Sequence, residues 1–279
     1  MQCSNHKKCN NKNYYLLLIL SSSYKCDRDC PFCTAKITQL EEGKNNWIEL
    51  ENQLDIIQKN SIVFDHVTIG GNGEPSLNSY DDLKYLKKIL DKNNYSFGFK
   101  KFETSGNIFF EDQKYKLFEK DYIFDITRVS ADDSIDMQIL KYKRNYTQAD
   151  TFKNATISIG HALLKNNINN LNNDIKLYFL RFPNLKSLKI KFLHFYPNLI
   201  NQNKTKNPYR EWVLANSILN THKNVDSVIR TLSNEFTIID KKNRYEWNTE
   251  SGKKIYLSVV KSSLENETIY FYRGTLSEY

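Results

Sequence analysis

The sequence has 279 residues, which is enough for one large domain or for one domain with an appendage. It contains no run of about 18 apolar residues, so we expect no transmembrane helix, and its polar start lacks the apolar core of a signal peptide. The formal net charge of +8 is spread along the chain, so it reflects either general composition or an anionic partner. Five cysteines, an odd number, argue against a disulfide framework and favour a reducing cytoplasm.

The first predicted strand, "YYLLLIL" at 14–20, is soon followed by three closely spaced cysteines. Cys26, Cys30 and Cys33 have the spacing Cys-x3-Cys-x2-Cys. Structural zinc normally takes four ligands, whereas soft thiolates suit iron and a short loop can hold three corners of an iron–sulfur cubane. We therefore favour a cluster with one open iron over a zinc site or merely clustered thiols. A fourth zinc ligand would have to come from the polar segment at 1–13, which holds Cys3, His6 and Cys9.

A helical pattern at 47–59 and a strand at 62–69 lead into a glycine-rich loop. Glycines let the backbone approach a ligand closely, and loop carbonyls and a carboxylate can accept hydrogen bonds from an ammonium group. On its own such a loop is weak evidence, because a glycine-rich turn after a strand can be an ordinary loop. The loop reads "GGNGEP" and contains Gly70, Gly71, Asn72, Gly73 and Glu74.

The triplet, with Phe32 directly before its third cysteine, and the glycine loop resemble the signature of radical S-adenosylmethionine (radical SAM) enzymes. The loop resembles the GGE motif of that family in a longer form, G-N-G-E-P. The resemblance implies one 4Fe–4S cluster on the three cysteines, with the amino and carboxylate groups of S-adenosyl-L-methionine (SAM) on the fourth iron. It further implies that Phe32 lies near the adenine and that Glu74 accepts hydrogen bonds from the SAM ammonium.

The rest of the chain alternates strand and helix patterns. Strands are expected at 97–104, 122–130, 155–160 and 187–195, and helices at 80–91, 112–120, 134–142 and 169–181. Six alternations imply a parallel sheet with right-handed crossovers, which fits the partial barrel of the family. We therefore predict an α/β fold in which a partial (β/α)6 TIM-like barrel at 14–206 carries a C-terminal α+β extension at 207–279.

Polar residues follow the predicted strands at their carboxyl ends, where barrels of this kind place their chemistry. After the third strand, "ETSGN" resembles the family's T-N-G stretch, and the resemblance implies that Glu103, Thr104 and Ser105 contact the ribose or methionine of SAM. After the fourth strand, Ser130 matches a serine position of the family and Asp132 is a further candidate. Turn chemistry alone also favours these residue types. Weaker candidates for the barrel mouth are Lys36, Ser158, His161, His194 and Tyr196.

The resemblance implies reductive cleavage of SAM to a 5′-deoxyadenosyl radical that abstracts a hydrogen atom, with flavodoxin or ferredoxin as the electron donor. No cysteine follows Cys33, which excludes an auxiliary cluster held by C-terminal cysteines, as in GTP cyclase members. Three substrate classes remain: a nucleotide, nucleoside or RNA base, a peptide to be epimerised or crosslinked, and a small metabolite. The charge favours an anionic substrate such as a nucleotide or RNA, and "CPFCTAKI" has some likeness to viperin-like nucleotide dehydratases, although their glycine loop is shorter. A module that uses its cluster only structurally is the non-enzyme alternative.

The C-terminal extension begins with the helical stretch "NPYREWVLANSILN", in which Pro208 takes a favoured place near the start. Three strand-like stretches separated by polar turns follow and predict a small antiparallel sheet. Because a partial barrel leaves its side open, we expect this extension to cover the barrel and to help select the substrate. Its candidate contacts are Tyr245, Trp247, Tyr270, Tyr272 and Arg273, with packing inside the extension as the alternative.

Overall fold

A single curved sheet organises the computed structural model of the chain. Among the residues that it describes, none of the helices combines the length and apolar character needed to cross a bilayer. The described residues are 14–20, 26–33, 44–60, 64–71, 73–92, 97–106, 114–143, 155–193, 208–218, 221–241, 244–249, 251–258, 267–272 and 275–278.

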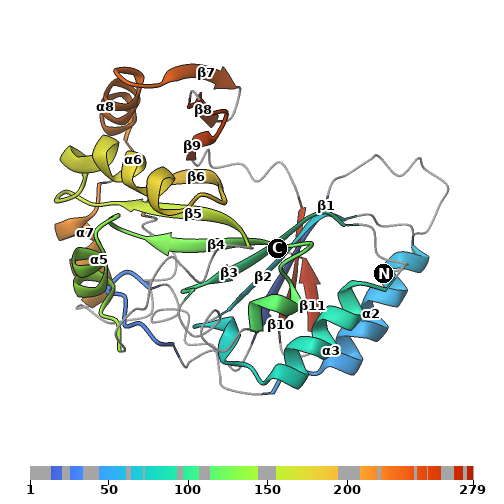
Figure 1. Ribbon diagram of the computed structural model, residues 1–279. Coiled ribbons are helices and arrows are strands. Elements are labelled where there is room, and N and C mark those ends of the chain that lie inside the picture. The colour runs from blue at the N-terminus through green and yellow to red at the C-terminus, as the bar shows by residue number, and fades with distance from the viewer. Residues whose placement is uncertain are drawn as a thin grey trace.

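Six parallel strands form the centre of the sheet, and they lie side by side in their chain order (Figure 1). The predicted barrel strands are all present, with ends shifted by at most a few residues. This confirms the α/β partial barrel. The strands are β1 (Tyr14–Leu20), β2 (Phe64–Gly71), β3 (Phe97–Thr104), β4 (Ile123–Arg128), β5 (Thr156–Leu163) and β6 (Leu185–Phe192).

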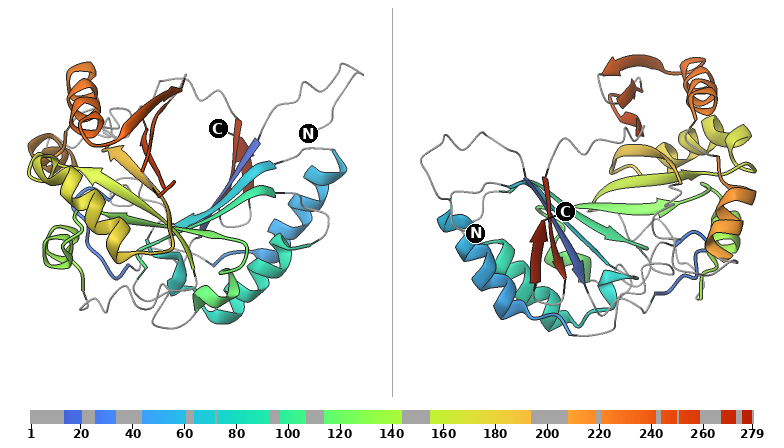
Figure 2. Two further views of the ribbon diagram at one scale, coloured as in Figure 1. Left: turned by 45° about the horizontal axis from the view of Figure 1, so that its top comes forward. Right: turned by 180° about the vertical axis from the view of Figure 1, so that it is seen from behind.

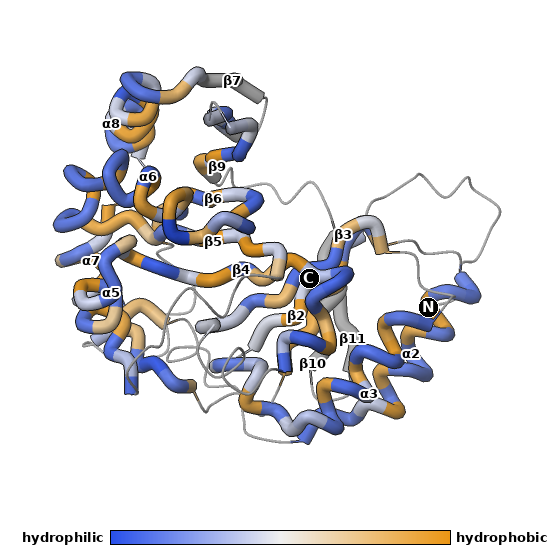
Figure 3. Tube along the Cα trace, viewed as in Figure 1, coloured by the Kyte–Doolittle hydropathy of each residue, from blue (hydrophilic) through white to orange (hydrophobic). Residues whose placement is uncertain are grey.

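Helices cover the convex face of this sheet and bury alternate strand residues beneath them. Leu16, Phe102 and Ile190 belong to one buried cluster with apolar residues of the helices, and Figure 3 shows hydrophobic and hydrophilic positions alternating along the helical turns. Ser79 and Asp132 cap two of the helices through their side-chain oxygens. The helices of this layer are α2 (Trp47–Lys59), α3 (Tyr80–Leu90), α5 (Asp133–Leu140) and α6 (Leu171–Arg181), with short 3-10 helices η2 (Pro75–Leu77), η3 (Lys114–Leu117) and η5 (Ile168–Asn170).

The helix predicted at 112–120 is, within its described part, only the short 3-10 helix η3. The rings of Tyr115 and Phe118 pack onto β3 and β4, where Phe118 lies 5.0 Å from Phe102 between ring centroids. The chain then turns tightly, because the Tyr122 amide donates to the Phe118 carbonyl at 3.0 Å. Two large rings within one turn thus anchor the segment to the core without a long helix.

Successive strand residues point to opposite faces, so the residues between the buried apolar ones lie on the concave face, which we call the lumen. The strand pairing places Thr68 beside Lys101 and Asp125 beside Ser158. Farther across the sheet, Gly160 pairs with Lys189. The lumen is therefore polar and carries charged side chains. Figure 2 shows that the sheet curls around it without closing.

The C-terminal strands do not form the small separate antiparallel sheet that the sequence predicts. They extend the barrel sheet at both edges: β9 pairs parallel with β6 and is followed by antiparallel β8 and β7, while β10 pairs parallel with β1 and is followed by β11. The physical reason is that a partial barrel exposes unpaired backbone groups along its two edge strands, which an added strand satisfies. The extension consists of α7 (Pro208–Asn216), α8 (His222–Ser233), β7 (Thr237–Lys241), β8 (Arg244–Asn248), β9 (Lys254–Ser258), β10 (Glu267–Tyr272) and β11 (Thr275–Glu278).

Candidate active site

The cysteine loop and the glycine loop lie at the same edge of the sheet. The cysteine loop follows β1 and the glycine loop follows β2, and these parallel neighbours end together, with Leu20 beside Gly71. All three cysteines of the triplet are reduced and half-buried. The Cys33 amide donates to the Cys30 carbonyl at 3.2 Å, which makes a tight turn between them. The two motifs that the sequence singled out are thus neighbours in space.

Arg28 ties the cysteine loop to the ends of β3 and β4. Its buried guanidinium donates to the Thr127 carbonyl at 2.7 Å and to the Ser105 carbonyl, and it stacks on the Tyr142 ring at 4.4 Å. From the other side, the Lys143 ammonium donates to the carbonyl of Cys26 at 2.8 Å. The loop is therefore positioned by contacts at several points, although its own sequence contains no regular structure.

Glu74 is a buried strut between the glycine loop and the end of β3. Its carboxylate accepts hydrogen bonds from the Ser76 amide at 3.1 Å, from the Thr104 hydroxyl at 2.7 Å and from the Ser105 amide. The Ser105 hydroxyl in turn donates to Asp27 of the cysteine loop at 3.0 Å. Burial and the nearby Asp27 charge raise the pKa of Glu74, against the opposing effect of these hydrogen bonds. Ser105 is thus the link between the two loops.

The donor set of the cysteine loop fits a cluster better than a single ion. Among the described residues, no three His, Cys, Asp or Glu side chains converge on a point where one ion could bind. A 4Fe–4S cluster does not require such convergence, since each thiolate binds a different iron of the cluster. Burial, with the charges of Asp27, Glu74 and Cys30, raises the pKa of Cys26 to about 12. Burial and the neighbouring negative charges thus disfavour the thiolate form of Cys26, the form that binds a metal.

The glycine loop can also accommodate the ammonium end of SAM. A carboxylate has about four acceptor positions, and the described residues supply donors to three of those on Glu74. Gly73 has a φ of 148° and Gly106 a φ of 92°, both values that L side chains rarely adopt. The predicted contacts of Gly70, Gly71, Gly73 and Glu74 with SAM are consistent with these positions and stay predictions; Asn72 lies outside the described residues.

Glu103 lies in the lumen next to the glycine loop. A Cβ atom added to Gly70 would meet Oε2 of Glu103 at 3.1 Å, so the carboxylate lies over this glycine. Lys101 pairs with the same carboxylate at 2.6 Å. The proposed contact of Glu103 with SAM remains a prediction, and Ser105 is already bonded to both loops.

Phe32 packs against Trp212 of the C-terminal extension, a contact that the sequence does not predict. Its ring centroid lies 5.5 Å from that of Trp212 on α7, and both rings join a small apolar cluster that also includes Cys30 and Tyr142. The helix of the extension therefore supports the cysteine loop directly. The predicted place of Phe32 near the adenine stays a prediction.

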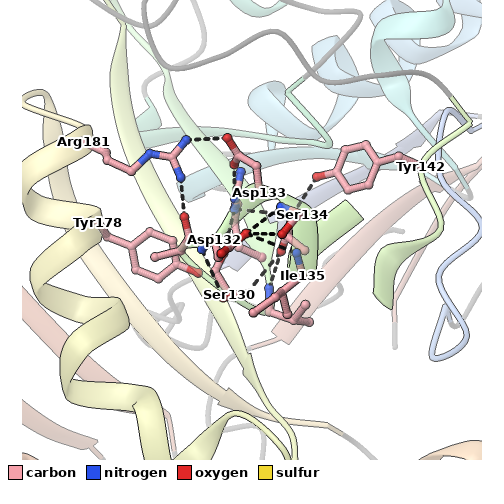
Figure 4. A network of polar contacts seen from close by, with 12 residues as sticks. Ser130, Asp132, Asp133, Ser134, Ile135, Tyr142, Tyr178 and Arg181 are labelled. Atoms are coloured by element: carbon pink, nitrogen blue, oxygen red, sulfur yellow. Dashed lines mark hydrogen bonds and ion pairs between the residues drawn. The ribbon is translucent and has the colours of Figure 1, made fainter. Parts of the chain in front are cut away.

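Ser130 and Asp132 belong to a polar network at the start of α5 (Figure 4). The Ser130 hydroxyl donates to Asp174 at 3.4 Å and accepts from the Asp132 amide at 3.1 Å. Asp132 accepts from the Ser134 amide at 2.8 Å and so caps the helix. Nearby, Arg181 pairs with Asp133 at 2.6 Å. Each predicted contact residue here already has a partner within the protein, and its role toward SAM remains a prediction.

Of the weaker candidates, Ser158 faces the lumen and His161 does not. The Ser158 hydroxyl accepts from Ser187 at 3.0 Å. His161 is fully buried on the helix side, with Nδ1 3.1 Å from the Tyr178 hydroxyl, and burial with the Arg128 charge lowers its pKa to about 3. The candidates Lys36, His194, Tyr196 and Arg273 and the side chains of Tyr270 and Tyr272 lie outside the described residues.

Trp247 is not a surface contact, so this prediction was wrong. The side chain is fully buried, and its indole donates to the Ser233 hydroxyl at 3.4 Å. The Tyr245 ring lies 6.2 Å away on the same strand. The indole fills the space between α8 and the strands of the extension, because large aromatic side chains supply much of the core of a small layer.

A group of charged side chains in the lumen is not among the residues predicted from the sequence. One carboxylate oxygen of Asp125 is 3.3 Å from Lys101, 3.5 Å from Lys189 and 3.7 Å from Lys191. Burial would raise the pKa of Asp125, but the three ammonium groups hold it well below its usual range. Lys189 and Lys191 alternate with apolar residues in "LKSLKIKF", and this pattern of one strand face is a signal that could have found the group.

No protein-family model matches the chain, and no curated protein is similar to it in sequence. Solved structures are similar in fold. The structure "Native anSMEcpe with bound AdoMet and Cp18Cys peptide" superposes with a TM-score of 0.55 and 17% identity over 80% of this chain. SuiB from Streptococcus suis, bound to its precursor peptide SuiA, superposes with a TM-score of 0.54 and 13% sequence identity, also over 80% of this chain. This chain covers 59% and 47% of the lengths of those proteins. The chain therefore has the fold of radical SAM enzymes, the partial barrel that its cysteine and glycine motifs predict.

Proposed function

We propose that this chain is a radical SAM enzyme that binds one 4Fe–4S cluster through Cys26, Cys30 and Cys33. The observation that carries the proposal is the link made by Ser105, whose amide donates to Glu74 and whose hydroxyl donates to Asp27. This residue holds the cysteine loop beside the glycine loop in a barrel of the matching fold. A metal site with only a structural role has no need of the second loop.

A cluster held by Cys26, Cys30 and Cys33, together with bound SAM, would supply the radical chemistry for removing a hydrogen atom from the substrate. The chain itself positions and shields the reactants. Arg28 and Tyr142 fix the cysteine loop, and Glu74 offers a further acceptor position to the SAM ammonium. Phe32 and Trp212 form an apolar wall next to the loop and limit access of water. A cytoplasmic reductant such as flavodoxin or ferredoxin is the proposed electron donor.

Among the substrate classes, a peptide is supported by the fold neighbours, since anSMEcpe and SuiB both hold peptides in their structures. A nucleotide or RNA base is the second candidate, and the excess of lysines in the lumen favours it. Both classes can offer an anionic group to these lysines. The shared reaction step is removal of a hydrogen atom from carbon.

The test is reductive cleavage of SAM by the anaerobically reconstituted full chain. With dithionite as the reductant, the wild type should release 5′-deoxyadenosine and methionine, both measured by chromatography. The control is a variant in which all three loop cysteines are replaced by alanine, because it keeps the barrel and loses the cluster ligands. Cleavage by the wild type no faster than by this control would refute the proposed function.

A further inference from the structure

The charged group around Asp125 has more positive than negative charge. Three ammonium groups, those of Lys101, Lys189 and Lys191, lie around two carboxylates, those of Asp125 and Glu103. Among the described residues, this group therefore has an excess of one positive charge. The neighbouring Lys254 does not change this balance, since it pairs with Glu246 at 3.2 Å. An anion that joined this group would form charge-assisted hydrogen bonds with the ammonium groups.

Neutralising Asp125 needs fewer than three lysines. Lys101 and Lys189 donate hydrogen bonds to its carboxylate at 3.3 and 3.5 Å. Lys191 makes only a longer ion contact of 3.7 Å, and within the described part of the chain its ammonium forms no hydrogen bond. Its side chain is also the most exposed of the three, at 36% against 15% for Lys101. The donors of Lys191 are therefore available to another partner.

The barrel makes room for this lysine. Lys191 crosses the lumen over Gly160, where an added Cβ would lie 2.5 Å from its Nζ and 2.7 Å from its Cε. Any other residue at this position would push the ammonium away from its place. In contrast to the loop glycines, Gly160 has no unusual φ value that would explain its identity. The absence of a side chain at Gly160 therefore leaves the space that the Lys191 side chain occupies.

The second oxygen of Asp125 is a further sign that the group is incomplete. Oδ1 is buried and has no hydrogen-bond partner among the described residues, although the whole side chain is only 3% exposed. Buried carboxylate oxygens are normally satisfied. This oxygen can accept a hydrogen bond from a donor on a bound molecule, whereas the anionic group of that molecule would bind the lysines.

The lysines lie within reach of a substrate that reacts near the two loops. Lys101 precedes Ser105 by four residues along β3, which corresponds to about 13 Å in a strand. Glu103 lies between them and over Gly70. A substrate that extends from the loops into the lumen would therefore meet the lysines with its far end.

We propose that Lys101, Lys189 and Lys191 bind a carboxylate or phosphate group of the substrate and so orient its reacting carbon toward the loops. The inference rests on the proposed function for the identity of the bound molecule, whereas the anion site itself rests on the lumen geometry alone. Both carboxylates and phosphates accept charge-assisted hydrogen bonds from ammonium groups. An acidic side chain or carboxyl terminus of a peptide supplies the first, and a nucleotide supplies the second.

The test measures the reactivity of single lysines in the reconstituted full chain. An amine-acylating reagent is applied in sodium acetate, in inorganic phosphate and in sodium chloride at equal ionic strength, and each lysine is quantified by mass spectrometry. We expect acetate or phosphate to slow the acylation of Lys189 and Lys191 about fivefold relative to chloride, at several times the dissociation constant. Lys186, which is exposed on the same strand, should be unaffected. Stronger protection by acetate would identify a carboxylate, and stronger protection by phosphate a phosphate group.

Two variants and one matched control distinguish loss of the anion site from the general effect of removing a positive charge. Lys189→Gln should abolish most of the roughly fivefold protection of Lys191, as expected for a lost charge-assisted hydrogen bond, while the matched variant Lys186→Gln should leave this protection unchanged. Gly160→Ala should also weaken it without unfolding the protein, because only the end of a flexible side chain has to move. Absence of protection by both anions in the wild type, or equal effects of Lys189→Gln and Lys186→Gln, would overturn the anion site. Loss of SAM cleavage with intact protection would instead contradict only the proposed function.

Discussion

At the scale of single residues, Glu74 has two roles that a motif alone cannot separate. The resemblance implies that it binds the SAM ammonium, and the structure shows it as the acceptor for Ser76, Thr104 and Ser105. We predict that Glu74→Ala lowers the free energy of unfolding by at least about 2 kcal/mol, because several buried donors lose their acceptor. The same variant should lose affinity for SAM. Urea unfolding and calorimetry of SAM binding measure the two effects, and unchanged values in both would remove Glu74 from the site.

His161 gives the protein a specific dependence on pH. Its pKa is about 3 in the folded chain against 6.5 for an ordinary histidine, because burial opposes its charge. Between these pH values the unfolded chain binds a proton that the folded chain does not, so stability is lost as the pH falls below 6.5. Because of His161, the free energy of unfolding should fall by about 2 kcal/mol between pH 6.5 and pH 5. In urea unfolding, the free energy of unfolding of His161→Gln should decrease less between pH 6.5 and pH 5 than that of the wild type. His222→Gln, at an exposed position, should follow the wild type.

At the scale of elements, the sequence was informative where its pattern is local. The helix at 47–59 was predicted at its observed bounds, because its apolar positions have helical spacing and Asn46 caps it. The partners of the last strands were not predictable, since strand pairing at a sheet edge depends on contacts far apart in the chain. The helix α8 was also missed, although Val225, Val228 and Leu232 form an apolar face. The cysteine loop could be identified from its residues. The stacking of Arg28 on Tyr142, which we call the clamp, could not be predicted, because these residues meet only in the folded chain.

We predict that this clamp positions the cysteine loop for binding of the cluster. Arg28→Gln removes donors to Thr127 and Ser105 and the stacking on Tyr142. We expect the variant to lose about 2–4 kcal/mol of stability and to retain less iron after reconstitution, because its cluster ligands are less well positioned. Arg230→Gln on α8 is the control, since this exposed side chain donates, within the described part of the chain, to the Asp226 carbonyl of its own helix at 3.3 Å. Equal iron content in the two variants would show that the clamp does not support the cluster.

At the scale of the whole molecule, the C-terminal extension is part of the barrel. Its strands cover both edges of the sheet, and its core includes fully buried Trp247, Ile255 and Leu257. We therefore predict that a chain truncated after Asn207 exposes two strand edges and aggregates. Soluble yield and size-exclusion chromatography measure this, with the full chain as the reference. A monomeric truncated protein with a native-like thermal transition would show that the extension is a separate cover.

The central claim is that the cysteine loop holds one cluster with an iron open to SAM. Its most direct test is electron paramagnetic resonance of the reconstituted, dithionite-reduced full chain with and without SAM, together with iron analysis. We predict about four irons per chain and a reduced-cluster spectrum that changes when SAM is added. Replacement of Cys26, Cys30 and Cys33 by alanine should abolish both signals. A protein that takes up zinc and no iron, or a cluster whose spectrum is identical with and without SAM, would contradict the account.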